Sequence, residues 1–181
     1  IARAAFSYSG DLDPDGAVTA AGLKRIAPWK DGWTNLIFVD GKFSKTLSTA
    51  PGTAGNVRVA SLAEVVRNDG RAVEHHLGKH ATFEEDGFTA LNTAFLSDGA
   101  FVEVSGGRET GATVHLVFVT TERAQPRVTY PRTLVVAGPN AALTLVETYV
   151  GRTDAQYFTN AVTEIVAEEG AHVEHYRLLL E

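Results

Sequence analysis

The sequence contains no cysteine and no methionine among its 181 residues. Without cysteine there is no disulfide framework, no thiol nucleophile and no thiolate ligand for a metal. An open reading frame begins with Met, whereas this sequence begins with Ile1, so we expect a trimmed product or a piece of a longer protein. Because cysteine-free chains are common inside cells, the cytoplasm is the expected location.

Long apolar runs and basic stretches are missing as well. No segment approaches the roughly 18–20 apolar residues of a transmembrane helix, and no charged start followed by an apolar core marks a signal peptide. The chain carries 22 acidic against 16 basic residues, a net charge of −6. Since a phosphate backbone requires a positive patch, nucleic acid is not expected as a partner. The length suits one domain, or one domain with a smaller appendage.

Residues 1–96 are predicted to form a mixed α/β region. Helical composition covers residues 17–27, and residues 36–39 form a buried strand that returns after the turn Asp40-Gly41. Ser61 and Glu64 have the spacing of a capping box, which predicts a helix from residue 61 onward. Residues 83–95 contain a second helical stretch. Four side chains in this stretch are at helical spacing, namely Phe88, Leu91, Asn92 and Phe95.

From residue 97 onward the pattern is that of short strands separated by polar turns. Turns at 105–110, 138–140 and 168–170 are each followed by a strand-like run. The first apolar residues of these runs, Val114, Leu143 and Val173, are 29 and 30 residues apart. A constant period of this size predicts a stacked array, so we expect a parallel β-helix or solenoid over residues 97–181. A β-sandwich is the alternative. The last run lacks a polar cap, which predicts an incomplete β-helix and a natural chain that continues.

Two loops copy only part of a known binding motif. Residues 11–16 follow the D-x-D-x-D-G start of a calcium loop, but the twelfth position is Gly22 where a bidentate Glu is required. We therefore predict an acidic turn. Residues 106–113 have the spacing of a phosphate loop, but Ala112 stands at the position of the essential Lys. This segment is predicted to be a turn between strands.

The six histidines do not form a recognisable metal motif. On a helix, His76 and His80 would share a face at i, i+4, which can bind zinc, but no third ligand is evident. For the stretch containing His75, His76 and His80 a solvated helix end is the preferred interpretation. On a strand, His172 and His175 point to opposite faces, so they are not expected to share a metal. His115 is predicted to face solvent.

The remaining polar and aromatic clusters favour structural interpretations. The acidic groups at 84–86 and 168–169 are expected to be solvated turns. Trp29 and Trp33 are expected to anchor a small core or a contact surface. No G-x-S-x-G nucleophile motif occurs. The sequence therefore predicts no catalytic, cofactor-binding or metal-binding residue in this stretch.

Five segments, in the same order along the chain, resemble the SufD-type iron–sulfur cluster assembly proteins of the SufB/SufD family. They are FVDGKF (38–43), FTALNTAFLSDGAFVEV (88–104), YPRTLVV (130–136), LVETYVG (145–151) and YFTNAVTEIVAEEGAHVEHYRL (157–178). The resemblance covers residue 36 to the end and is weaker over the first 35 residues. The FVDG hairpin favours SufD over the related SufB.

This resemblance implies a helical N-terminal region followed by a right-handed parallel β-helix. It implies a non-catalytic scaffold subunit that acts with a SufB-like β-helix protein and a SufC-like ABC ATPase in iron acquisition and cluster assembly. The cluster belongs to the full complex, and the family's functional residues and SufC-binding helices lie beyond residue 181. We also expect self-association through the exposed last rung, or poor stability. A β-helix enzyme acting on acidic polysaccharide and a plain binding module remain the alternatives.

Overall fold

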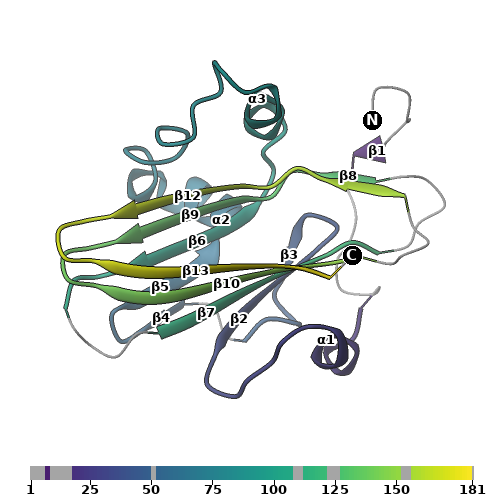
Figure 1. Ribbon diagram of the computed structural model, residues 1–181, viewed down its shortest axis with the longest axis horizontal. Helices are drawn as coiled ribbons and strands as arrows, with labels where there is room; N and C mark the ends of the chain where they lie inside the picture. Colours follow the sequence, from purple (N-terminus) through teal and green to yellow (C-terminus); the bar gives the residue numbers. More distant parts are fainter. Residues whose placement is uncertain are drawn as a thin grey trace.

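The computed structural model describes residues 7–8, 18–49, 52–107, 112–121, 127–151 and 156–180, and these form a mainly β structure with short helices (Figure 1). The predicted calcium-like loop at 11–16 lies outside the described residues. The strands form two five-stranded sheets, in the order β13-β10-β7-β2-β3 and β12-β9-β6-β5-β4, and a three-stranded sheet β1-β8-β11. Within the described ranges no helix is both long and apolar enough to cross a membrane.

The second half of the chain supplies three stacks of parallel strands. β7 (Ala112–Val119), β10 (Ala142–Val150) and β13 (His172–Leu180) pair in one sheet. β6 (Gly99–Val104), β9 (Arg132–Ala137) and β12 (Val162–Ala167) pair in the second. The short strands β8 (Arg127–Thr129) and β11 (Tyr157–Thr159) pair in the third, next to β1 (Ser7–Tyr8). The chain therefore visits the three sheets in turn and returns to each one.

Strand pairing tests the predicted period. Leu143 lies opposite Val173, which confirms the spacing of 30 residues. The first spacing was wrong by two positions, because Val114 pairs with Leu145 rather than with Leu143. The turns stack as the strands do: Gly107 N–H donates to Pro139 O at 3.2 Å, and Asn140 N–H donates to Glu169 O at 2.9 Å.

The first half adds strands and helices to both long sheets. A hairpin of β2 (Thr34–Val39) and β3 (Lys42–Ser44) joins β7, and β4 (Gly52–Ala54) with β5 (Val57–Ser61) joins β6. The predicted turn at Asp40-Gly41 is confirmed. Both residues have positive φ, 48° and 80°, as a type I′ hairpin turn requires.

Within the described residues, three short helices and one 3-10 turn lie outside the sheets. They are α1 (Ala20–Ile26), α2 (Leu62–Asn68), the 3-10 turn at Gly70–Ala72, and α3 (Gly87–Ala94). Thr19 caps α1, and Ser61 caps α2 by accepting a hydrogen bond from the Glu64 N–H, as predicted. The apolar helical spacing at 88–95 was misleading. Asn92 is the buried residue of α3, whereas the side chains at 88, 91 and 95 are among the exposed hydrophobic ones.

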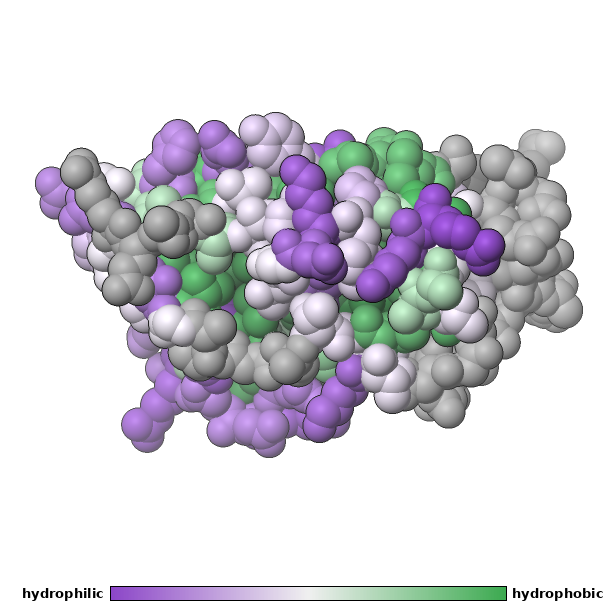
Figure 2. All heavy atoms as spheres, turned by 90° about the horizontal axis from the view of Figure 1, so that it is seen from below, coloured by the Kyte–Doolittle hydropathy of each residue, from purple (hydrophilic) through white to green (hydrophobic). Residues whose placement is uncertain are grey.

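The main hydrophobic core lies between the inner faces of the two five-stranded sheets. Parallel pairing puts aromatic rings above one another there: Phe38 stacks on Phe118 with centroids 5.0 Å apart, and Phe118 stacks on Tyr149 at 4.9 Å. Leu23 of α1 packs on the outer face of the first sheet, and Leu62 of α2 packs on the outer face of the second. Seen from below, the surface is largely hydrophilic, with hydrophobic atoms showing between the polar side chains (Figure 2).

Candidate functional site at the end of the strand stack

The three strands β11, β12 and β13 each lie at the edge of a sheet, and together they form one end of the strand stack. Among the described residues, β13 pairs only with β10. Two of its apolar side chains are open to solvent: Tyr176 is 52% exposed and Leu179 is 66% exposed. An unpaired edge with apolar side chains is a template for a further strand. A further strand, from the same protein or from a partner, could pair with this edge.

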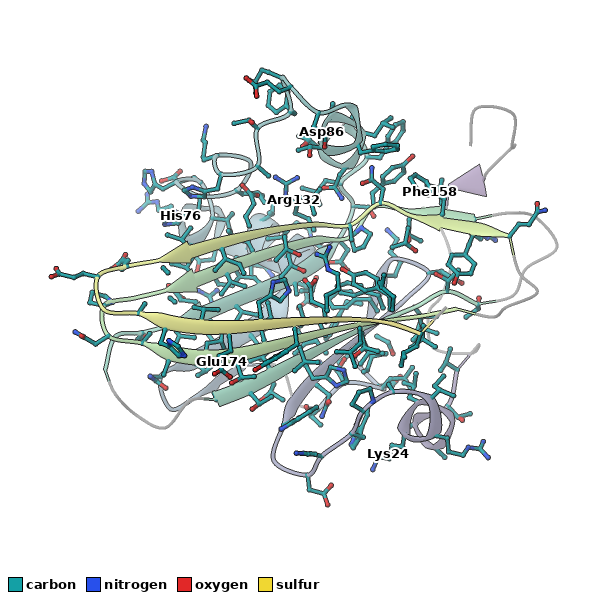
Figure 3. All side chains as sticks on the ribbon, in the orientation of Figure 1. Lys24, His76, Asp86, Arg132, Phe158 and Glu174 are labelled. Atoms are coloured by element: carbon teal, nitrogen blue, oxygen red, sulfur yellow. The ribbon has the colours of Figure 1, made fainter. Side chains whose placement is uncertain are left out.

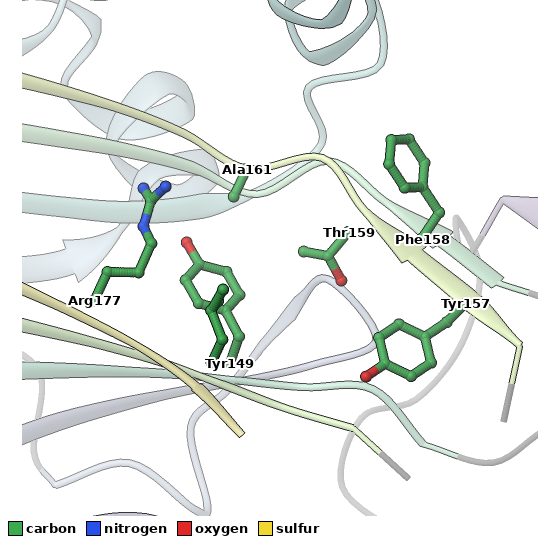
Figure 4. A pocket seen from close by; sticks show the side chains of 7 residues that line it. Tyr149, Tyr157, Phe158, Thr159, Ala161 and Arg177 are labelled. Atoms are coloured by element: carbon green, nitrogen blue, oxygen red, sulfur yellow. The ribbon is translucent and has the colours of Figure 1, made fainter. Parts of the chain in front are cut away.

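A pocket of about 310 Å³ opens at this end, between β10, β11 and β13 (Figure 4). Its wall is about equally apolar and polar: aromatic and aliphatic side chains line it together with hydroxyl groups, and Arg177 supplies the charge. The lining residues are Tyr149, Tyr157, Phe158, Thr159, Ala161, Arg177 and Leu179. Such a surface suits an apolar segment that also offers a hydrogen-bond acceptor to the guanidinium.

Beside this pocket a buried carboxylate organises the interior. The Glu147 side chain is fully buried on β10, in line with the core residues Leu145 and Tyr149. Its Oε2 accepts hydrogen bonds from Arg177 Nε at 3.1 Å and Nη2 at 3.0 Å, and it lies 3.2 Å from His175 Nε2. Its Oε1 accepts from Thr163 Oγ1 at 2.8 Å. The group thus joins β10, β12 and β13 across the inside of the stack.

The electrostatics of this cluster favour the ionised carboxylate. Burial by itself would raise the pKa of Glu147, because a buried charge loses its hydration. The hydrogen bond from His175, the positive charge of Arg177 and the hydrogen bond from Thr163 outweigh burial, so the pKa lies below its ordinary value. Arg177 also lies over the Tyr149 ring, 5.6 Å from its centroid. Its guanidinium is therefore held by a charge on one side and an aromatic face on the other.

A second buried pair connects the region before β6 to the stack, and its Arg132 is labelled in Figure 3. Arg132 on β9 and Glu164 on β12 are essentially fully buried, and Arg132 Nη2 donates to Glu164 Oε1 at 2.7 Å. The carboxylate also accepts from the backbone N–H groups of Gly78, at 2.9 Å, and His80, at 2.9 Å. Burial would raise the pKa of Glu164, but these two N–H groups and Arg132 outweigh burial, so the pKa is lowered.

The same pair reaches α3. Arg132 Nη1 donates to Asn92 Oδ1 at 3.0 Å, and Asn92 Nδ2 donates to the carbonyls of Pro131 and Asn160 at 2.9 and 2.8 Å. Asn160 Nδ2 in turn donates to Phe88 O at 2.7 Å. These bonds explain why α3 buries an amide and leaves Phe88 exposed. The helix is attached by these hydrogen bonds, together with ring contacts of Phe88 with Phe158 and of Phe95 with Tyr130.

His115 was predicted to face solvent, and this was wrong. The side chain is fully buried on β7, with Nδ1 2.9 Å from Asn35 Oδ1 and Nε2 2.8 Å from Thr148 Oγ1. Asn35 Nδ2 donates to Trp33 O, so Asn35 Oδ1 is the acceptor and His115 Nδ1 carries the proton. Burial lowers the pKa of His115 to about 4. The ring is therefore neutral at pH 7 and holds β2, β7 and β10 together.

The other sequence candidates do not line the pocket. The acidic residues at 84–86 and 168–169 are exposed, as predicted, and Asp86 caps α3. A strand follows Gly107, beginning at Ala112, so the phosphate-loop spacing has no helix behind it. Trp29 packs on the small core under α1, and Trp33 contacts the His115 ring edge to face at 5.5 Å.

The histidines give one unexpected pairing. The His76 and His80 rings meet, although residues 73–79 form turns rather than the helix considered from the sequence. No group of three or more potential metal ligands occurs in the part of the chain that the structure describes. Glu147, Arg132 and Glu164 were not singled out from the sequence. Glu147 lies on the inner face of its strand, with Leu145 and Tyr149, whereas Arg132 and Glu164 lie with Leu134 on the outer face of the second sheet. Their charged identity within strands was the signal that could have found them.

Comparison with known proteins gives matches along most of the chain. The family model for the SufBD protein N-terminal region matches residues 33–116. The family model for the SufBD core domain, described as SUF system FeS cluster assembly, matches residues 118–181. The first match ends at residue 116 and the second begins at residue 118, and both bounds lie in β7.

Three curated proteins are similar to the chain, and each is named an iron–sulfur cluster assembly SufBD family protein. The one from Synechocystis sp. is 31% identical over 152 residues, which are 80% of this chain and 33% of that protein. Those from Trieres chinensis and Pyropia yezoensis are 29% and 28% identical, over 64% and 74% of this chain and 24% and 26% of theirs. The chain therefore spans a quarter to a third of the length of these relatives.

Proposed function

Since the chain belongs to the SufB/SufD family of iron–sulfur cluster assembly proteins, we propose that it forms part of a structural subunit in iron–sulfur cluster biogenesis. The subunit is of the SufD type and non-catalytic. It works in the cytoplasm with a SufB-like β-helix protein and a SufC-like ABC ATPase, and the ATPase binds through a part of the protein outside this stretch. The iron–sulfur cluster is the cargo of the whole complex.

The three stacked sheets are, on this proposal, successive turns of a right-handed parallel β-helix. The support is the return of the chain to each sheet after 30 residues, at Arg127 and Tyr157, at Arg132 and Val162, and at Ala142 and His172. The end of a β-helix is open where its outermost strands are unpaired. Such an end interacts by pairing with an added strand and by packing against it.

One observation carries the proposed assembly role: the edges of β11, β12 and β13 lie together at one end, next to a pocket with both apolar and polar lining. A further β-helical turn or a partner's β-helix would pair with all three edges at once. It would cover Leu179 and the Arg177 guanidinium in doing so. The large buried side chains described above, by contrast, hydrogen-bond to one another, as expected of groups that maintain a scaffold.

The test of the assembly role is an affinity pull-down of the full-length parent protein from its host, with mass spectrometry of what is recovered. Stoichiometric recovery of an ABC-type ATPase and a second β-helix protein is expected. A protein that is recovered alone would refute the assembly role.

The edge is tested separately, on the 181-residue chain, by light scattering over a concentration series. Self-association that Leu179→Lys abolishes is expected, because a charge at this edge opposes pairing. Val66→Lys is the matched control, since Val66 is also exposed but lies on α2. A monodisperse monomer at high concentration, with cooperative unfolding, would contradict the proposed edge.

A further inference from the structure

Two histidine rings face each other on the segment between α2 and α3. His76 Nδ1 lies 3.4 Å from His80 Nε2, and the ring planes differ by 25° with centroids 5.6 Å apart. In the absence of a metal, one ring must donate a proton to the other, because two lone pairs cannot face each other favourably. Two imidazole nitrogens that share one proton can instead share one metal ion.

The separation of the two nitrogens fits a chelate. Zinc binds imidazole nitrogen at about 2.0–2.1 Å with tetrahedral geometry, which places two such nitrogens about 3.4 Å apart. The separation of 3.4 Å between His76 Nδ1 and His80 Nε2 matches this value. Binding of a metal ion therefore requires rotation of the two imidazole rings but no rearrangement of the backbone.

The chain holds both histidines in place through contacts that do not involve their rings. The backbone N–H groups of Gly78 and His80 donate to the buried Glu164 carboxylate. The His76 N–H donates to the carbonyl of Val73, which is itself buried. Because the Arg132–Glu164 pair fixes this turn, little conformational entropy is lost when a ligand bridges the rings.

We propose that His76 and His80 form a surface chelate for a borderline divalent transition metal such as Cu²⁺, Ni²⁺ or Zn²⁺. The two protein nitrogens occupy two coordination positions, and water completes the shell. His80 is exposed and His76 is half-buried, so the site opens to solvent. Such a site exchanges its metal readily and differs from a closed structural zinc site, which has four protein ligands.

The adjacent His75 supplies a matched control. Its side chain is 80% exposed, and its Nε2 lies 3.3 Å from Oε1 of Glu74, so this ring takes no part in the His76–His80 pair. It has the same chemistry and nearly the same position in the chain, and its ring contacts a carboxylate rather than a second imidazole. Removal of His75 is therefore expected to leave the chelate intact.

The test is calorimetric titration of the purified, tag-free protein with Ni²⁺, repeated with Cu²⁺, Co²⁺ and Mg²⁺. One ion per chain is expected, with affinity rising in the order Co²⁺, Ni²⁺, Cu²⁺ and no response to Mg²⁺, which prefers oxygen ligands. His76→Ala and His80→Ala should each weaken Ni²⁺ binding by at least about tenfold, whereas His75→Ala should not. Equal weakening by His75→Ala, or no binding to the unmodified protein, would overturn the proposal.

A second readout locates the ion and does not depend on how the variants fold. Substoichiometric Cu²⁺ should selectively broaden the amide NMR signals of Gly78 and His80. The signals around His172 and His175, which lie on β13 in the other five-stranded sheet, should remain sharp at the same ratio. Broadening that begins at His172 or His175 would place the ion elsewhere and refute the His76–His80 chelate.

Discussion

Acidification between pH 6.5 and 4.5 is expected to destabilise the protein mainly through His115. The unfolded chain binds a proton at this residue with an ordinary pKa of 6.5, whereas the folded chain does so only at about 4. The stability that depends on a neutral His115 is fully present above pH 6.5 and is lost as the pH falls toward 4.

The structure sets the size of this effect. A difference of about 2.5 pKa units corresponds to ~3 kcal/mol in the free energy of unfolding, lost at up to about 1.4 kcal/mol per pH unit. The unfolded chain begins to protonate Glu147 and Glu164 about one pH unit above their ordinary pKa of 4.5, so the lowered pKa values of the folded carboxylates add to acid destabilisation from about pH 5.5 downward. The part of the window above about pH 5.5 therefore separates the histidine from these carboxylates. A loss of ~3 kcal/mol is large against the 5–15 kcal/mol by which domains are stable.

The assay is urea denaturation at half-unit pH steps, followed by tryptophan fluorescence. Trp33 lies against the His115 ring and is a direct reporter. His115→Gln keeps a donor and an acceptor but cannot titrate, so its stability should depend much less on pH in this window. His75→Gln, at an exposed position, should retain the full slope.

Two outcomes would refute this reasoning. One is a slope in His115→Gln equal to that of the unmodified protein. The other is obtained from the unmodified protein alone: an NMR titration in which the His115 ring protonates near pH 6.5. The same spectra report the tautomer, for which the hydrogen bond to Asn35 requires the proton on Nδ1.

Three further substitutions are expected to change stability, as measured by urea denaturation. Glu164→Gln leaves the buried Arg132 without its charge partner and should cost about 3 kcal/mol or more, while hydrogen exchange at residues 78–81 accelerates. Glu147→Gln should cost less, about 1–2 kcal/mol, because its partner Arg177 is 42% exposed and can reach water. Gly99→Ala places a Cβ 1.8 Å from the backbone carbonyl oxygen of Arg132 and should lower the free energy of unfolding by about 1–3 kcal/mol. The control is Gly70→Ala, which has open space around it and should change that free energy by no more than about 0.5 kcal/mol.

The strands and turns of the second half could be predicted from the sequence because their signals are local. β-branched runs between polar turns mark strands wherever they pack, and positive φ at Asn140 and Gly170 suits the residue types found there. The Ser61 cap and the Asp40-Gly41 turn depend on contacts within three residues. These strands, turns and caps could therefore be predicted without knowledge of the tertiary packing.

The buried polar residues could not be predicted because partners far along the chain decide their burial. His115 is flanked by apolar residues on a strand, and its partners Asn35 and Thr148 lie 80 and 33 residues away. Asn92 has helical neighbours that are more apolar than itself, yet it is the buried one. Periodicity records which positions share a face. It does not record which face another segment will cover.

These polar groups also account for the register of the stack. A slip of β12 against β9 by two residues would keep the alternation of inward and outward side chains, so the apolar core alone would oppose it weakly. The same slip would move Glu164 about 7 Å along the strand, away from Arg132 and the N–H groups of Gly78 and His80. Two buried charges would then lose their partners, at a cost of several kcal/mol. The pair therefore selects one register for the repeats and one position for the segment before α3.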